Sequence, residues 1–215
     1  LPTGEQMLGY PVAGSGNDTR VGHRRFNFVW YRPTKNQEEL TTLLTDETGT
    51  VHPNGIPPAL VDKKHVDSMR TASKKILAPQ FAEAIEKTVQ PFFQPIYDVY
   101  SEQIHFQRVA LMGDASFVAR PHVGMGVTKA AEDAQSINRH ILALGANPNA
   151  LRAYELERLP IGQKIIRHAQ FLGRYMQAQG FNGGDHQPNL LRNPNTVMIE
   201  TALGLDKASE ESIKI

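Results

Sequence analysis

Apolar residues recur at steps of three and four positions in the later part of the chain, which is the spacing of one face of an α-helix. The clearest run begins after Gly126 and contains Val127, Ala130, Ala131, Ala134, Ile137, Ile141 and Leu144. Gly145 and Pro148 follow it, and glycine followed by proline is typical of a helix C-terminus. The pattern therefore predicts a helix over 127–144.

Helical spacing extends to other parts of the chain. It predicts helices in four further segments, namely 38–45, 61–88, 149–176 and 196–203. Pro79 lies inside the second of these segments, so we expect two helices or one kinked helix there. Pro160 lies inside the third, where we expect a kink or a break. Residues 180–195 are rich in Gly, Asn and Pro and predict an irregular loop.

The earlier part of the chain contains an alternating pattern with a period of two. From Arg24 to Arg32, the aromatic residues Phe26, Phe28 and Trp30 fall on one face, which predicts a strand of an antiparallel hairpin. The aromatic row has two interpretations. The commoner one is sheet core, because aromatic residues are enriched in strands. In the other, Phe28 and Trp30 line an aromatic substrate pocket.

These elements predict an α+β fold, in which a mostly antiparallel sheet is packed with helices. A strand, a loop and a helix follow, and then C-terminal helices. We expect three parts: a sheet and helices over 1–107, the strand–loop–helix unit over 108–145, and a helical segment over 146–215.

The strand–loop–helix unit places a carboxylate opposite a helix N-terminus. The apolar run 109–112 ends at Gly113 and Asp114, and Gly124 and Gly126 open the helix. Free backbone N–H groups and the helix dipole favour negative charge at such an N-terminus. The arrangement suits a ligand that offers hydroxyl groups and negative charge, as flavin nucleotides do. The simpler alternative is a Gly-Asp turn that only caps a helix.

The unit also carries, in order, Gly113-Asp114-Ala115, Pro121, Gly124-x-Gly126 and Glu132-Asp133-Ala134. This series resembles the second flavin-binding motif of the flavoprotein aromatic hydroxylases, the family with the p-hydroxybenzoate hydroxylase fold. The aromatic segment 24–33 resembles the branch of that family that acts on dihydroxypyridines. The chain departs from the family pattern at Ser116-Phe117, where many members have His, and at Thr128, where Asn is frequent.

The resemblance implies an FAD-dependent monooxygenase that hydroxylates a hydroxylated aromatic or heteroaromatic ring, such as a dihydroxypyridine. NADH or NADPH would be the co-substrate and dioxygen the oxidant. Asp114 would accept hydrogen bonds from the ribityl hydroxyls, and backbone N–H groups at the helix start would face the pyrimidine edge of the flavin. The cofactor-binding residues implied are Gly113, Asp114, Pro121, Gly124, Met125, Gly126 and Val127.

Because the flavin carries the chemistry, no catalytic acid or base is assigned. His122 lies inside the flavin loop and is a further candidate for the substrate pocket, although a lone histidine is more often structural. The eight histidines show no metal-ligand spacing, so no metal site is expected.

Composition narrows the class of protein. The chain has 23 basic and 22 acidic residues, which gives no electrostatic footprint for nucleic acid. It has no cysteine, so disulfide frameworks and iron–sulfur sites are excluded. No apolar run reaches the about 20 residues that span a bilayer. We therefore expect a cytoplasmic protein that acts on a small molecule.

The 215 residues lack the strand–Gly-x-Gly-x-x-Gly–helix unit that receives a dinucleotide pyrophosphate. We therefore interpret them as the C-terminal portion of an enzyme whose N-terminal dinucleotide-binding half is missing. Alone, this portion should bind FAD weakly or not at all and be inactive. The strand 109–112 would be an unpaired edge that favours self-association, for example as a homodimer.

Two alternatives remain. One is a flavoprotein without oxygenase activity, and the other is a binding module that kept the fold without the chemistry. A Gly-x-Gly-x-x-Gly unit encoded upstream in frame would favour the enzyme.

Overall fold

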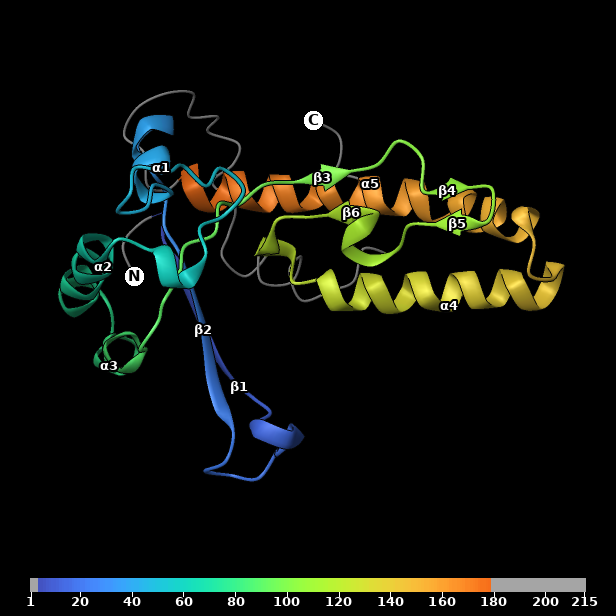
Figure 1. Cartoon of the computed structure of the whole chain (residues 1–215). Coiled ribbons are helices and arrows are strands. Elements are labelled where there is room, and N and C mark those ends of the chain that lie inside the picture. The colour runs from blue at the N-terminus through green and yellow to red at the C-terminus, as the bar shows by residue number, and fades with distance from the viewer. Residues whose placement is uncertain (1–3, 179–215) are drawn as a thin grey trace. The chain divides into compact units, whose positions relative to one another are not determined.

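The computed structural model describes residues 4–178, and their side chains as far as Arg174. These residues form two compact units, the first ending at Pro95 and the second beginning at Ile96 (Figure 1). The predicted loop over 180–195 and the predicted helix over 196–203 lie outside the described residues.

The first unit combines a two-stranded antiparallel ribbon with three helices. Its elements are β1 (Gln6–Val12), β2 (Arg25–Tyr31), α1 (Gln37–Leu43), α2 (Lys63–Ile76) and α3 (Pro79–Lys87). The register of the ribbon places Met7 opposite Trp30 and Gly9 opposite Phe28, which confirms the predicted hairpin. Pro79 begins α3 instead of kinking a longer helix, because a proline in the first turn removes only a donor that has no helical partner.

The core of the first unit lies where β1, α2 and α3 meet. Its buried residues are Met7, Met69, Leu77 and Ile85. Phe28 and Trp30 pack against this cluster and are partly buried, whereas Phe26 on the same strand is 54% exposed. The aromatic row therefore serves as core over only part of its length.

The second unit contains four short strands and two long helices. Its elements are β3 (Val99–Tyr100), β4 (His105–Phe106), β5 (Val109–Ala110), β6 (Phe117–Val118), α4 (Gly126–Leu144) and α5 (Pro148–Ala178). The strands form two small antiparallel sheets, β3 with β6 and β4 with β5. Strands and helices share one core, whose buried members are Ile104, Phe117, Tyr154 and Ile166.

The α+β class and the antiparallel pairing are confirmed, but one strand prediction is wrong in extent. The run 109–112 supplies only Val109–Ala110 as a strand. β5 pairs with β4 in a tight hairpin, so one of its edges is paired, and within the described residues the other edge has no strand partner. The side chain of Tyr154 replaces further strand pairing, since its hydroxyl donates to the Leu111 carbonyl at 2.9 Å.

Of the kink or break expected at Pro160, the break is wrong, because α5 continues through this residue without interruption. A proline inside a helix leaves the carbonyl four residues earlier without its partner. Here that carbonyl belongs to Leu156, which is 69% exposed. Water can therefore satisfy it, while packing on both sides of Pro160 holds the helix together.

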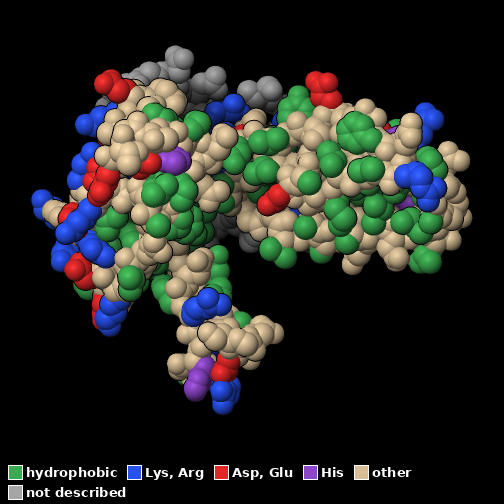
Figure 2. Space-filling model, viewed as in Figure 1, with side chains coloured by type: hydrophobic (Ala, Val, Ile, Leu, Met, Phe, Trp, Pro, Cys, Tyr) green, Lys and Arg blue, Asp and Glu red, His purple; other side chains and the backbone are tan. Residues whose placement is uncertain are grey.

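Apolar side chains remain exposed on the second unit, and green side chains gather over its visible face in Figure 2. The large exposed apolar residues of its described part are Ile96, Tyr97, Val99, Tyr100, Phe106, Val109, Met112, Val127, Leu142, Leu144 and Leu156. Surfaces of this kind are typical of contacts with another protein surface. The expected self-association stays a prediction.

Gly162 allows α5 to lie close to the buried ring of Phe117. A Cβ atom at this glycine would be 2.3 Å from Cε2 of that ring. We expect Gly162→Ala to lower the free energy of unfolding by about 1–2 kcal/mol, because overpacking outweighs the higher helix propensity of alanine. Denaturant unfolding measures the difference.

Gly126→Ala is the matched control for Gly162→Ala. No atom lies within 4 Å of a Cβ at Gly126, so this variant should be as stable as the parent or slightly more stable. Equal stability of the two variants would contradict the packing role of Gly162.

Candidate functional site

Asp114 lies just past β5, in a short turn over Gly113–Ala115. Its side chain is exposed. Within residues 4–174 it has neither a hydrogen bond nor an ion pair. The N-cap of α4 is Met125, without a side-chain cap, so the alternative of a helix-capping Gly-Asp turn finds no support. The carboxylate is available to a ligand.

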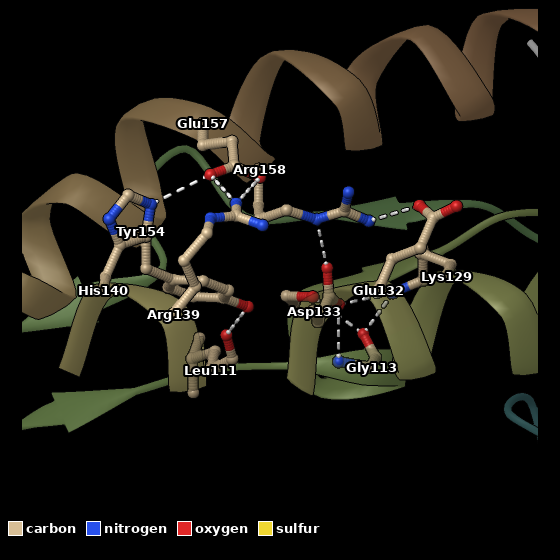
Figure 3. Close-up of polar contacts among 11 residues, drawn as sticks. Leu111, Gly113, Lys129, Glu132, Asp133, Arg139, His140, Tyr154, Glu157 and Arg158 are labelled. Carbon is tan, nitrogen blue, oxygen red and sulfur yellow. Dashed lines mark hydrogen bonds and ion pairs between the residues drawn. The ribbon is translucent and has the colours of Figure 1, made fainter. Parts of the chain in front are cut away.

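Both the N–H and the carbonyl of Gly113 form hydrogen bonds with side chains (Figure 3). Its N–H donates to Oδ2 of Asp133 at 2.9 Å. Its carbonyl accepts a hydrogen bond from Nζ of Lys129 at 2.5 Å and another from Oγ of Ser116 at 2.8 Å. The φ angle of Gly113 is +59°, a left-handed conformation that favours glycine. The hydroxyl of Ser116 thus helps to hold this turn.

Charged side chains from α4 and α5 form a buried ion network that consists of Lys129, Asp133 and Arg158. Nε of Arg158 donates to Oδ1 of Asp133 at 2.7 Å, and Nζ of Lys129 lies 3.6 Å from Oδ2. At the edge of the network, Nη2 of Arg158 donates to Glu132 at 3.0 Å. The exposed fractions of Lys129, Asp133 and Arg158 are 2%, 0% and 4%.

Burial and charge act in opposite directions within this network. Burial lowers the pKa of the Lys129 ammonium, and the nearby carboxylates of Asp133 and Asp114 counter that effect only in part. Burial likewise disfavours the charged form of Arg158, but its bonds to Asp133 and Glu132 outweigh burial and raise its pKa. Asp133 is therefore the carboxylate that favours the charged forms of both Lys129 and Arg158.

The N-terminus of α4 is open. The chain turns over Pro121–Val123, Gly124 adopts a φ of +63°, and α4 begins at Gly126. The first backbone hydrogen bond into the helix runs from the Lys129 N–H to the Met125 carbonyl at 2.8 Å. Among the residues the structure describes, the N–H groups of the preceding positions 126–128 have no backbone acceptor.

Side chains leave this helix end accessible. Within the part of the chain that the structure describes, a Cβ atom at Gly124 or Gly126 would meet no atom within 4 Å, and Val127 is 87% exposed. The network joins this open end to Asp114, because Lys129 and Asp133 lie in the first turns of the same helix. The motif residues of the second unit thus lie in α4, in the loop over 121–125 that precedes it, and in the turn that α4 holds.

The loop before α4 is anchored by an ion pair that the sequence analysis missed. The Arg120 N–H donates to Oδ1 of Asp98 at 2.9 Å, and its guanidinium donates to Oδ2 at 2.7 Å. Gln170 of α5 adds a bond to Oδ2 at 3.1 Å. The two charged residues are 22 positions apart, so no local spacing could have revealed the pair.

His122 follows this anchor and is half-buried beside Gly173. A Cβ atom at Gly173 would lie 3.4 Å from Nδ1 of His122 and 2.9 Å from Cδ of Arg120. Burial and the positive charge of Arg120 lower the pKa of His122, which favours the neutral form of its imidazole. A neutral ring suits a pocket wall, but the pocket role stays a prediction.

Phe28 and Trp30 belong to the first unit, whereas the flavin-motif residues belong to the second. Nε1 of Trp30 donates to Glu5 at 2.8 Å, and the guanidinium of Arg32 lies 4.4 Å from the centre of a Trp30 ring. Both aromatic side chains pack on the core, as in the commoner interpretation. Their role in a substrate pocket stays a prediction.

The described residues contain neither a candidate metal site nor a candidate membrane span. No three His, Asp or Glu side chains are grouped there so that they could hold a metal ion. None of the helices in residues 4–178 has both the length and the apolar character that a membrane span requires.

The ion pair of Asp98 and Arg120 makes stability depend on pH. Burial disfavours the Asp98 carboxylate, but its bonds from Arg120 and Gln170 outweigh burial and lower its pKa. A depressed pKa contributes stability above the unfolded value of about 3.9, and this contribution is lost as the pH falls through the folded value.

Asp98→Asn should therefore lower the free energy of unfolding by about 1–2 kcal/mol at pH 7. The difference should shrink as the pH falls below about 4. Denaturant unfolding at pH 7 and in acid measures it, with the exposed Asp67→Asn as the control. A difference that does not change with pH would contradict the ionic role of Asp98.

Known proteins are similar to this chain over part or most of its length. Residues 2–98 match the family described as FAD binding domain-like. A 2,6-dihydroxypyridine 3-monooxygenase of Paenarthrobacter nicotinovorans is 24% identical over 207 residues, which are 96% of this chain and 48% of that protein. A phenol 2-monooxygenase of Aspergillus fumigatus is 27% identical over 154 residues, 61% of this chain and 26% of that protein.

A solved structure has a fold similar to that of this chain. The structure of 2,6-dihydroxypyridine-3-hydroxylase from Arthrobacter nicotinovorans matches with a TM-score of 0.70 and 22% identity, over 86% of this chain and 46% of that one. The chain thus spans half or less of the length of these relatives. A match over 96% of the chain necessarily includes the segment 108–145, which lies beyond the family match. The chain is therefore homologous over most of its length to a 2,6-dihydroxypyridine 3-monooxygenase, and its first unit matches the FAD binding domain-like family.

Proposed function

We propose that the full-length protein containing this chain is an FAD-dependent monooxygenase. Its substrate is a hydroxylated aromatic or heteroaromatic ring such as a dihydroxypyridine, and NADH or NADPH and dioxygen are consumed. One observation carries the proposal. The Asp114 carboxylate is exposed and has no partner in the described residues, and the residue before it is hydrogen-bonded to α4, the helix whose N-terminus is open. The names of the homologues support the reaction class and the aromatic substrate.

The residues present fit a flavin. Asp114 would accept hydrogen bonds from the ribityl hydroxyls, and the N–H groups at the start of α4 would stabilise the negative charge that reduction places on the pyrimidine edge of the ring. Glycines at this helix start let the backbone approach the ring closely. The proposed cofactor-binding residues are Gly113, Asp114, Pro121, Gly124, Met125, Gly126 and Val127. When bound, the flavin supplies the oxygen-transfer chemistry, and the protein supplies position and exclusion of water.

Purified full-length protein tests the proposal. Flavin released on denaturation is quantified, and NADH- or NADPH-dependent oxygen consumption is followed with 2,6-dihydroxypyridine and with phenol. We expect bound FAD and a hydroxylated product from one of these rings. Bound flavin that reduces an artificial acceptor without any oxygenated product would identify a non-oxygenase flavoprotein. Failure to bind any flavin would leave the binding module as the remaining function.

The 215 residues alone should hold FAD weakly and be inactive. Affinity is the sum of local contacts minus the free energy of association, and the pyrophosphate contacts are expected from an N-terminal dinucleotide-binding half. We also propose that the full-length protein is cytoplasmic and forms a homodimer.

A further inference from the structure

Two side chains of α4 hold both backbone groups of the residue that precedes Asp114. Lys129 donates to the Gly113 carbonyl, and Asp133 accepts from the Gly113 N–H. The two side chains are four positions apart and therefore lie on one face of the helix. We call these contacts the Gly113 clamp. Because the first turn of the same helix carries the open N–H groups, the clamp fixes Asp114 relative to them.

The need for a clamp follows from the backbone. Gly113 lacks the Cβ atom that limits rotation in other residues, so its turn has many accessible conformations when it is not held. Hydrogen bonds to a ligand weaken steeply when donors and acceptors are misplaced. A site made from a turn and a helix therefore binds one ligand tightly only if the two are held at a constant separation.

Stability alone does not explain a lysine at this position. The side chain of Lys129 is 2% exposed, and its ammonium lies 5.1 Å from the centre of the Phe117 ring. An apolar side chain of similar length would fill the same space without the loss of ammonium hydration, and such replacements of buried ions are often neutral or stabilising. The ammonium does, however, supply a donor to the Gly113 carbonyl that an apolar side chain lacks.

We propose that Lys129 is a positioning residue for the flavin, and this rests on the proposed function. Its ammonium, together with Asp133, holds Gly113 so that Asp114 meets the ribityl hydroxyls while the α4 N-terminus meets the ring. Arg158 of α5 holds Asp133 in place from the opposite side. Lys129 has no contact with the flavin itself and acts through Asp114.

The test is a double-mutant cycle in the full-length protein. Apoprotein of the parent, Lys129→Met, Asp114→Ala and the double variant is titrated with FAD, and quenching of flavin fluorescence gives each Kd. We expect Lys129→Met to weaken FAD binding about tenfold. In the Asp114→Ala background the same change should have little further effect, because the group that it positions is already absent.

Two controls separate positioning from loss of stability. Lys87→Met removes an exposed lysine that pairs with Glu83 four residues away, and it should leave FAD affinity unchanged. Ile166→Val removes one methylene from the core of the second unit, and it should lower the unfolding temperature without weakening FAD binding.

Ser116→Ala removes another donor to the Gly113 carbonyl. It should weaken FAD binding about threefold, and it provides a milder test if Lys129→Met does not fold.

The outcomes distinguish the inference from the function on which it rests. Unchanged affinity in Lys129→Met and Ser116→Ala would overturn the clamp, while the flavin site would stand if Asp114→Ala still weakens binding. Independent, additive losses in the double variant would also overturn it, because Lys129 would then not act through Asp114. Parent protein that binds no FAD would overturn both proposals.

Discussion

Asp133→Ala should lower the free energy of unfolding by about 3–5 kcal/mol, the largest stability effect that we expect in this chain. Among the described residues, the substitution leaves Lys129 without a carboxylate within 4 Å and leaves Arg158 with Glu132 as its remaining partner. Uncompensated charges in a dry interior are strongly unfavourable. The Gly113 N–H loses its acceptor as well. Thermal and denaturant unfolding measure the effect.

Glu132→Ala is the matched control, because Glu132 precedes Asp133 on α4 and also accepts a bond from Arg158. Its side chain is 41% exposed, whereas that of Asp133 is fully buried. Exposed pairs contribute about 1 kcal/mol or less, so this variant should be near the parent in stability. Similar losses in the two variants would show that burial does not set the importance of Asp133.

Asp114→Ala should weaken FAD binding by about one to two orders of magnitude in the full-length protein. Hydrogen bonds to a charged group contribute about 1.5–3 kcal/mol each, and water partly replaces a lost carboxylate. Asp114 is exposed and bonded to no described residue, so the fold should not suffer. Hydroxylation at saturating FAD should fall much less, because the carboxylate holds the cofactor and takes no part in the chemistry.

Titration of the apoprotein followed by a product assay at saturation separates these two effects. Glu102→Ala, another exposed carboxylate of the second unit, should change neither quantity. Unchanged FAD affinity with abolished hydroxylation would move Asp114 from cofactor binding into the catalytic machinery.

The sequence by itself determined the elements around the site. The residues of the segment alone were enough to predict α4, because helical spacing marks its length and Gly145, with a φ of +83°, ends it. The local sequence also marked an interruption at Pro79, although it left two helices or one kinked helix open, and it predicted the hairpin that carries Phe28 and Trp30. The position of Asp114 just past a strand, in a turn that α4 contacts, followed from the motif.

Only the tertiary structure decided which side of each element is buried. Helical spacing marked Val127 as part of the apolar face of α4, yet it is 87% exposed, and the buried positions of that helix are Lys129, Asp133 and Ser136. A charged residue is buried when opposite charges and backbone groups from distant segments satisfy it. Those partners, Gly113 and Arg158, lie 16 residues before Lys129 and 25 residues after Asp133.

The same reason explains the other differences. α5 continues through Pro160 because its exposed side lets water reach the carbonyl that the proline leaves unpaired. The site loop is fixed by Asp98 and Arg120, which are distant in sequence and meet only after the chain has folded. Local spacing determines which backbone hydrogen bonds form within a segment, whereas burial and ion pairing depend on which segments meet.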